Sequence, residues 1–409
     1  MQEQGAAPWP LVVIGAGAAG LLAAIFAGRR GIPVLMLDTR RQPGAKIRVS
    51  GGSRCNVLPS RAALEDFHTS GSHKALRNIL FSWPLSEVHD FFQRELGVPL
   101  KTEPTGKVFP VSDRSKDVVD ALLGEAARVG VCLRGQARVA ALRVAGDGFE
   151  LTLEGGEPIL ARRVVLATGG KSLPRTGSDG GGWRLASGLG HTVLPTYPAL
   201  VPLLTPDPAW RALAGVALPV SLQAERAGRP IASVAGDFLF THTGFSGPAA
   251  LDISRHFAAP GGGDVALVAR WSALDGPGWE QALARDGARP VAPLVREHLP
   301  RRLAAALLQR AGLHEEQRRS TLTRGARLRL VEALTRCPLQ VSGNEGYRTA
   351  EVTAGGIPLE EVHTRSLESR RVPGLYLCGE VLDVTGKLGG YNFLWAWVSG
   401  RRVGAAIPA

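Results

Sequence analysis

A strand, a glycine-rich turn and a helix near the start of the sequence constrain the fold more than any other feature. Residues 11–14 read Leu-Val-Val-Ile, a run that predicts a buried strand, and Gly15 ends it. In the sequence G-A-G-A-A-G that begins there, Gly15 makes the tight turn, Gly17 lets a pyrophosphate approach the backbone, and Gly20 lets helix and strand pack closely. The helix predicted over residues 21–30 directs its partially positive N-terminus at the phosphates.

A second predicted strand over residues 32–37 completes a βαβ unit, and Asp38 stands directly after it. A carboxylate at this position accepts hydrogen bonds from a ribose diol. The unit therefore predicts a dinucleotide site formed by Gly15, Ala16, Gly17, Ala18, Ala19, Gly20, Asp38 and Thr39. Because FAD and NAD share this pattern, the choice between them depends on the rest of the chain.

Residues 9–28 carry no charged side chain, and the run is long enough to imitate a membrane span or a signal-peptide core. The residues before it include Glu3 and no lysine or arginine, whereas a signal peptide begins with positive charge. Glycines at the fingerprint spacing also interrupt the run. We therefore expect a buried strand and helix, no membrane segment and a cytoplasmic protein.

The cysteines form neither a Cys-x-x-Cys motif nor a recognisable metal-ligand spacing, so the sequence predicts no metal site. They stand far apart, at Cys55, Cys132, Cys337 and Cys378. Cysteines without an evident partner fit a reducing compartment.

The formal net charge of +12 allows two interpretations. A basic surface favours anionic partners such as nucleic acid. Alternatively, 41 arginines against 7 lysines reflect codon usage in a GC-rich genome, and the arginines are scattered along the chain. We favour the second interpretation and predict a small-molecule substrate, although the charge leaves nucleic-acid binding open. Nothing in the sequence indicates an oligomeric state.

Five further motifs carry a family resemblance. They read K-I-R-V-S-G-G-S-R-C-N from Lys46, K-V-F-P-V-S-D-R-S from Lys107, A-T-G-G-K-S from Ala167, F-T-H-T-G-F-S-G-P from Phe240 and C-G-E-V-L-D-V-T-G-K-L-G-G-Y-N-F-L-W-A from Cys378. In content and order the chain resembles the HI0933-like (YhiN-like) family of NAD(P)- and FAD-dependent oxidoreductases, which includes aminoacetone oxidase-like enzymes and bile-acid-pathway reductases. Ser53 departs from the family pattern, which has a glycine there.

The resemblance implies an α/β fold: a Rossmann-like FAD/NAD(P)-binding domain of the glutathione-reductase type, in two sequence pieces, with an inserted β-barrel and a helical subdomain. The residue patterns agree, since short strands punctuated by Pro and Gly run from 197 to 271 and apolar residues at helical spacing run from 276 to 336. We expect the FAD-binding domain over residues 1–195 and 350–409, the barrel over 196–275 with a return strand at 338–349, and the helical subdomain over 276–337.

The resemblance also implies non-covalent FAD. No second G-x-G-x-x-G is present, so the sequence predicts no separate NAD(P)H domain: either NAD(P)H docks transiently over the flavin as donor, or the donor is the substrate itself. Lys46 and Arg54 are expected to contact phosphate or flavin carbonyls rather than solvent alone, and Cys55 to pack as a small buried side chain. Glu380 is expected against the ribityl hydroxyls. The further candidate cofactor-binding residues are Ser50, Gly51, Gly52, Asn56, Ala167, Thr168, Gly169, Gly170, Gly379, Asp383, Gly390, Asn392 and Phe393.

The catalytic residues are not evident from the sequence. His242 is the best titratable candidate because histidine can act as an acid near neutral pH, but it can equally be a structural loop residue. Tyr391 and Lys387 are comparable candidates. We predict a FAD-dependent oxidoreductase that transfers hydride through flavin N5 to a small organic substrate, or passes electrons to O₂. The alternatives are a flavin-dependent RNA-modifying or RNA-binding protein and a non-catalytic flavin-bound sensor.

Overall fold

The computed structural model describes residues 7–156, 158–284 and 290–408. The chain forms two compact units, the first over residues 1–197 with 352–409 and the second over 198–351. These bounds fall within two residues of the domain limits expected at 195/196 and 349/350. The roles expected for these domains stay predictions.

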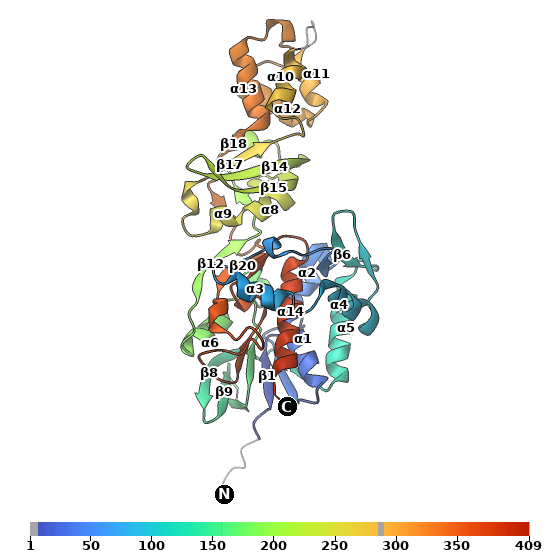
Figure 1. The fold of residues 1–409 in the computed structure, drawn as a ribbon, viewed down its shortest axis with the longest axis vertical. Helices are drawn as coiled ribbons and strands as arrows, with labels where there is room; N and C mark the ends of the chain where they lie inside the picture. Colours follow the sequence, from blue (N-terminus) through green and yellow to red (C-terminus); the bar gives the residue numbers. More distant parts are fainter. Residues whose placement is uncertain (1–6, 157, 285–289, 409) are drawn as a thin grey trace. The chain divides into compact units, whose positions relative to one another are not determined.

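A parallel sheet of five strands forms the centre of the first unit (Figure 1). Its order is β21-β11-β1-β2-β7, with bounds Leu375–Leu377, Val164–Leu166, Leu11–Ile14, Val34–Leu37 and Cys132–Arg134. Every residue of the first four of these strands is buried, as expected for a parallel sheet covered on both faces. The strands predicted over residues 11–14 and 32–37 are therefore β1 and β2, with β2 beginning two residues later.

Helices α1 (Ala18–Gly28) and α14 (Tyr391–Ala406) pack closely against each other. A Cβ atom at Gly400 would lie 2.2 Å from the Ala19 carbonyl oxygen, so this crossing needs a glycine. The hydroxyl of Ser399 accepts a 3.0 Å hydrogen bond from the Gly379 N–H. Helix α14 thus fixes the turn after β21 to the helix that follows β1.

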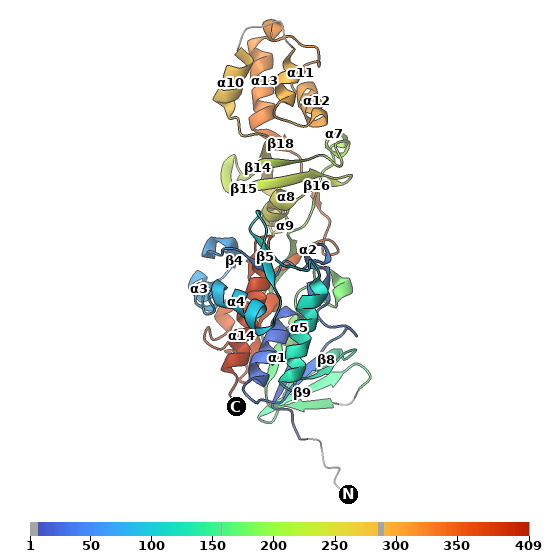
Figure 2. The same ribbon diagram turned by 90° about the vertical axis from the view of Figure 1, so that its right-hand side faces the viewer.

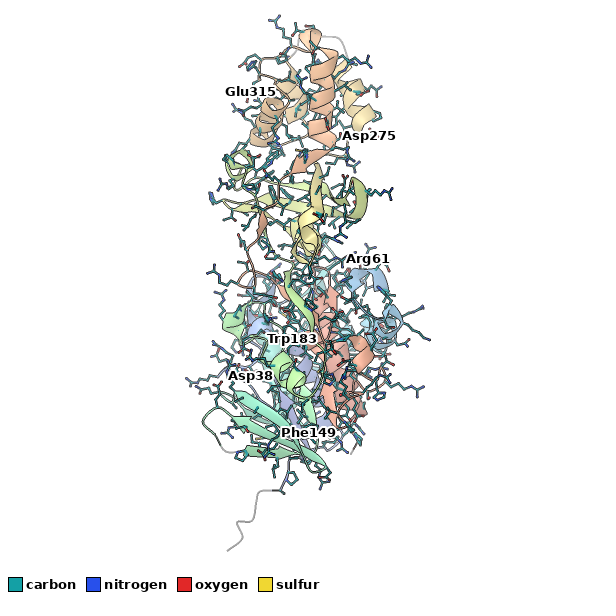
Figure 3. The ribbon with its side chains drawn as sticks, turned by 90° about the vertical axis from the view of Figure 1, so that its left-hand side faces the viewer. Asp38, Arg61, Phe149, Trp183, Asp275 and Glu315 are labelled. Carbon is teal, nitrogen blue, oxygen red and sulfur yellow. The ribbon has the colours of Figure 1, made fainter. Side chains whose placement is uncertain are left out.

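Smaller elements surround the parallel sheet. Strands β8 (Val139–Ala145), β9 (Gly148–Leu153) and β10 (Pro158–Ala161) form an antiparallel sheet that the sequence did not predict, and Figure 3 labels Phe149 on it. The other strands pair as β3-β6-β5 (Leu58–Pro59, Lys107–Pro110, Leu100–Thr102), β22-β4 (Thr385–Gly386, Phe67–His68) and β12-β20 (Leu194–Ala199, Val352–Gly356). The other helices are α2 (Ala45–Ser53), α3 (His73–Leu80), α4 (Leu85–Asp90), α5 (Ser115–Arg128) and α6 (Gly181–Gly188).

The second unit contains an antiparallel sheet in the order β18-β17-β14-β15-β16-β13-β19 (Figure 2). The bounds in this order are Cys337–Leu339, Val265–Arg270, Ala217–Arg226, Arg229–Phe240, Gly244–Ser246, Leu203–Leu204 and Gly343–Asn344. Among the described residues β18 does not pair with β19, so the sheet is open rather than a closed barrel. Pro338 lacks an N–H and suits β18 to an edge. Strand β15 has 12 residues and is longer than the short strands expected in this part of the sequence.

Helices α7 (Pro208–Arg211), α8 (Pro248–Ile253) and α9 (Arg255–Ala258) pack near this sheet, and α10 (Gly276–Ala284), α11 (Val291–Arg296), α12 (Arg301–Arg310) and α13 (Arg324–Thr335) form the expected helical group. Trp210, Phe238, Phe240 and Trp271 are buried together in the core of this unit. No helix among the described residues is both long and apolar enough to span a bilayer.

A buried polar network joins distant segments of the first unit. His191 Nδ1 lies 2.5 Å from the Glu361 carboxylate, and its Nε2 lies 2.8 Å from the Ser369 hydroxyl. Arg371 donates a 2.7 Å hydrogen bond to the other Glu361 oxygen. Burial opposes ionisation of Glu361, but hydrogen bonds from Arg371, Thr192 and His191 outweigh it and lower the pKa to about 2.

We expect Glu361→Gln to lower the free energy of unfolding by about 3 kcal/mol at neutral pH, because it breaks a buried pair. Since the folded pKa of Glu361 lies below its usual 4.5, its stabilisation is present above that pH and is lost as the pH falls toward 2. Urea unfolding of wild type and variant across this range should show the difference shrinking with acid. Glu150→Gln, at a pair with the largely exposed Arg143, is the control and should cost less than about 1 kcal/mol. If the difference in free energy of unfolding between wild type and Glu361→Gln stayed constant as the pH falls, the ionised Glu361 would not have the stabilising role described.

Candidate functional site

A cavity of about 1000 Å³, including its open mouth, runs along one edge of the parallel sheet in the first unit. Its walls come from the residues that follow four of the strands: Gly15 after β1, Asp38 after β2 (Figure 3), Ala167 after β11 and Gly379 after β21. The carboxyl ends of parallel strands are where open α/β sheets bind their ligands.

The three fingerprint glycines have different tasks. Gly15 adopts φ +105°, and a Cβ there would lie 2.4 Å from the Ala167 carbonyl oxygen. A Cβ at Gly20 would lie 1.9 Å from the Gly15 carbonyl oxygen. Both glycines therefore serve backbone packing. Gly17 has nothing within 4 Å of a built Cβ and begins α1 without a side-chain cap, so it leaves open space at the helix N-terminus, where an anion is favoured.

Asp38 holds the turn as well as lining the cavity. One carboxylate oxygen accepts a 2.7 Å hydrogen bond from the Ala16 N–H and the other a 2.7 Å bond from the Arg40 N–H. Burial raises the pKa of Asp38, and these backbone hydrogen bonds, with the charge of Arg40, oppose that rise. Each oxygen can accept a further bond, as a ribose diol requires.

The far end of the cavity is lined by Lys46 and Glu380. The Glu380 oxygens accept four hydrogen bonds, from Lys46 Nζ (2.6 Å), Gly170 N (3.1 Å), Ser172 Oγ (3.1 Å) and Thr353 N (2.7 Å). This corrects the expectation that Glu380 serves ribityl hydroxyls, because its acceptor capacity is used within the protein. Lys46 also donates to Ser172 at 2.8 Å and, with three N–H bonds, keeps one for a ligand.

The distance between the two ends indicates an elongated ligand. Three strand spacings separate β2, which Asp38 directly follows, from β21, which leads into the turn that contains Glu380. At about 4.8 Å each, they span roughly 14 Å. That length suits a dinucleotide whose pyrophosphate lies near Gly17, with its second half on the side of Lys46 and Phe393.

The open space at Gly17 fits a bound dinucleotide. No atom lies within 4 Å of a Cβ built there, at the N-terminus of α1. Thr168 Oγ1 has no hydrogen-bond partner among the described residues, but it is buried against α6, where a Cβ built on Gly182 would lie 1.8 Å from it. The turn at Gly17, rather than this hydroxyl, therefore accommodates a dinucleotide such as FAD.

The cavity brings together just over half of the expected cofactor-binding residues. They are Gly15, Ala16, Gly17, Ala18, Ala19, Asp38, Thr39, Lys46, Ala167, Thr168, Gly169, Gly379, Glu380 and Phe393. The remainder do not line it: Gly20, Ser50, Gly51, Gly52, Arg54, Cys55, Asn56, Gly170, Asp383, Gly390 and Asn392.

Arg54 and Asp383 have other partners, which corrects their expected roles. Arg54 pairs with Glu103 at 2.7 Å and Asp113 at 3.3 Å, and its guanidinium lies 3.9 Å from the centre of the Phe109 ring. Asp383 is 2% exposed and accepts a 2.7 Å hydrogen bond from the Ser70 N–H.

Cys55 is buried, and burial raises the pKa of its thiol to about 12, so it stays protonated at neutral pH. The Asn392 side chain bonds both the N–H and the carbonyl of Gly386.

None of the three catalytic candidates lines the cavity. Lys387 pairs with Asp66 at 2.9 Å, and Tyr391 packs edge-on against Phe67. His242 is an exposed residue of the second unit.

The sequence missed two groups of lining residues. The first group leads into β8 and consists of Ala137, Arg138 and Val139. The second group consists of Thr176 to Asp179, Gly181 and Gly182. The two groups are joined by an ion pair between Arg138 and Asp179. The glycine-rich run from Gly177 to Gly182 is a sequence pattern from which the second group could have been predicted to lie near the cofactor. No local pattern marks the residues before β8.

The chain is similar to known proteins over most of its length. The HI0933-like protein Rossmann domain matches residues 10–406. A ribosomal RNA dihydrouridine synthase from Escherichia coli K12 is 35% identical over 393 residues, covering 95% of each chain. A 3-dehydro-bile acid delta(4,6)-reductase from Clostridium scindens is 33% identical over 406 residues, covering 96% of this chain and 98% of that protein.

A solved structure shares the fold. The 3-ketosteroid-delta4-(5alpha)-dehydrogenase from Rhodococcus jostii RHA1 has a TM-score of 0.50 at 17% identity, covering 99% of this chain and 98% of that chain. At such identity the likeness concerns the fold alone, and it confirms the Rossmann-like α/β class. The family match spans nearly the whole chain, so this protein belongs to the HI0933-like family and is a flavin-dependent oxidoreductase.

Proposed function

We propose that this protein binds FAD non-covalently in the cavity of the first unit and reduces a carbon–carbon double bond conjugated to a carbonyl group. The observation that carries the proposal is the cavity itself, with open space at Gly17 and a length of about three strand spacings. The names of the two relatives supply the reaction type. Both dihydrouridine formation and delta(4,6) reduction of a 3-oxo steroid add hydrogen across a double bond conjugated to a carbonyl.

The residues of the cavity bind and orient the cofactor. The first turn of α1 and the backbone at Gly17 hold the pyrophosphate, and Asp38 accepts hydrogen bonds from the ribose. Lys46, held by Glu380, places one N–H and a positive charge where negative charge develops. When bound, the flavin supplies the hydride chemistry. With one dinucleotide fingerprint in the sequence, NAD(P)H is proposed as a transient donor.

For the substrate we propose a uridine of ribosomal RNA, reduced in the cytoplasm. Two relatives at 35% and 30% identity are ribosomal RNA dihydrouridine synthases, and the +12 charge of this chain suits a polyanionic substrate. This choice revises the sequence-based preference for a small molecule. An unsaturated 3-oxo steroid is the second candidate, on the basis of the 33% identical bile-acid reductase.

The test is anaerobic reduction of the bound flavin, followed by its reoxidation. NADH or NADPH should bleach the flavin absorbance. Addition of ribosomal RNA that lacks dihydrouridine should restore the absorbance and convert uridine into a product heavier by two hydrogen atoms in nucleoside mass spectrometry. A 4,6-unsaturated 3-oxo steroid is the parallel acceptor, and buffer alone is the control. Failure of both acceptors to reoxidise the flavin would contradict the proposed reaction.

A further inference from the structure

The segment from Arg301 to Arg336 in the second unit contains nine arginines, no lysine and three acidic residues. It comprises α12, α13 and their connection, which belong to the helical group that packs beyond β17 and β18 (Figure 1). Arginine also serves as a structural hydrogen-bond donor, so the side chains that have partners inside the protein must be separated from those that do not.

Four of the nine arginines hold the second unit together. Their partners are backbone carbonyls or acids, and the contacts are Arg302 to the carbonyl of Ala214 (3.1 Å), Arg310 to Asp207 (2.9 Å), Arg329 to the carbonyl of Ala311 (3.1 Å) and Arg336 to Glu225 (3.0 Å). These four side chains are accounted for by folding.

Four others form what we call the arginine surface: Arg318, Arg319, Arg324 and Arg327, all within ten residues of sequence. In the described ranges of the chain no carboxylate lies within ion-pair distance of any of them, and Arg319 Nε is buried without a hydrogen-bond partner. Two acids precede Arg318: Glu315 is paired with Arg296, and Glu316 is exposed with no ion pair among the described residues. The arginine surface therefore carries four positive charges that no carboxylate of the described residues pairs, with Glu316 as the one unpaired acid next to it in sequence.

This arrangement does not stabilise the helix. Arg324 and Arg327 lie in the first turn of α13, which contains no acidic residue. Positive side chains at this end oppose the helix dipole and repel one another. The first turn is capped internally, since the Thr323 hydroxyl accepts a 3.2 Å hydrogen bond from the Ala326 N–H. Arg324 and Arg327 therefore lower the stability of α13, and no contact among the described residues offsets this loss. Sequence features of this kind are expected at functional sites, where a binding partner supplies the offsetting contact.

We propose that the arginine surface binds the phosphate backbone of the RNA whose uridine is reduced. Guanidinium groups bind phosphate oxygens through paired, charge-assisted hydrogen bonds. Leu328 lies beside Arg324 and Arg327 on α13 and is 48% exposed, so it offers apolar contact to a sugar or base. The inference rests on the proposed function, because it assigns the RNA substrate a binding surface on the second unit.

The test uses the flavin-loaded full-length protein and a fluorescein-labelled RNA hairpin as the probe, with anisotropy titrations between about 50 and 200 mM salt. Arg324→Gln with Arg327→Gln is expected to weaken RNA binding about tenfold or more at low salt and to reduce the slope of log affinity against log salt by about 1.5. Adding Arg318→Gln and Arg319→Gln should weaken binding further. Arg226→Gln with Arg229→Gln, which removes the same charge from the β14–β15 hairpin, is the matched control and should change affinity less than about twofold.

The outcomes separate this inference from the proposed function. Bleaching of the flavin by NAD(P)H and reduction of a small unsaturated 3-oxo compound should be unchanged in the double variant. Loss of RNA affinity with the flavin reaction intact supports the arginine surface. Equal RNA affinity of the wild type and the quadruple variant would overturn the inference. So would a wild-type protein that binds no RNA at low salt. A control variant that loses as much RNA affinity as the double variant would overturn it too. A flavin that no donor bleaches counts against the proposed function instead.

Discussion

Replacing Gly17 with valine is expected to leave the protein folded and to weaken flavin binding at least about 100-fold, or about 2.7 kcal/mol. A Cβ at this position meets nothing within 4 Å, and the backbone at φ −84° accepts any residue. The new side chain therefore projects into the space where the pyrophosphate approaches the N-terminus of α1. The measurement is the flavin content of the purified variant and its affinity for added FAD, followed by fluorescence quenching.

Two comparisons make this result specific. The flavin-free variant should melt within a few degrees of flavin-free wild type, because no packing is disturbed. Gly188→Val is a matched control, since a Cβ at Gly188 also meets nothing within 4 Å but this glycine lies outside the cavity. It should retain flavin. A Gly17→Val protein that binds FAD as tightly as wild type would refute the placement of the pyrophosphate.

Replacing Gly400 with alanine should lower the free energy of unfolding by about 2 kcal/mol or more. Alanine favours a helix over glycine by about 1 kcal/mol. At Gly400, however, the added Cβ would lie 2.2 Å from the Ala19 carbonyl oxygen and 3.0 Å from the Ala19 Cα. The backbones of α1 and α14 would have to separate, because the neighbour is backbone and cannot move aside alone, so we expect a cost at the upper end of the usual range for overpacking, about 3 kcal/mol.

Gly124→Ala is the matched substitution. Gly124 lies within α5, and a Cβ there meets nothing within 4 Å, so the helix preference acts alone and should raise stability by about 0.5–1 kcal/mol. Urea unfolding of both variants should give changes of opposite sign. If Gly400→Ala were as stable as Gly124→Ala, the close crossing of α1 and α14 would be wrong.

The parts of the site that the sequence predicts are those encoded by local pattern. The strand, turn and helix around Gly15, Gly17 and Gly20 are contiguous, and Asp38 follows the next buried strand at a fixed offset. These residues line the cavity or support the turn as expected. The motif from Ser50 to Asn56 also follows a local rule. Ser53 stands where the family has glycine, and it adopts φ +69°, a backbone conformation that favours glycine.

The rest depends on partners that sequence spacing does not reveal. The donors to Glu380 come from residues 46, 170, 172 and 353, and only the folded chain shows that they use up its acceptor capacity. Likewise, nothing near Arg54 in sequence indicates that Glu103 and Asp113 will pair with it. The lining residues before β8 are set by tertiary contact, since Arg138 reaches the cavity beside its partner Asp179.

We propose that the cavity of the first unit holds FAD without a covalent bond. The most direct measurement is the cofactor released from folded, purified protein by acid precipitation, identified by chromatography and counted per chain. We predict about one FAD per chain, with none left on the precipitated protein, and its loss in Gly17→Val. A folded protein that cannot be loaded with FAD, or whose flavin is FMN or stays attached to the precipitated chain, would contradict this claim.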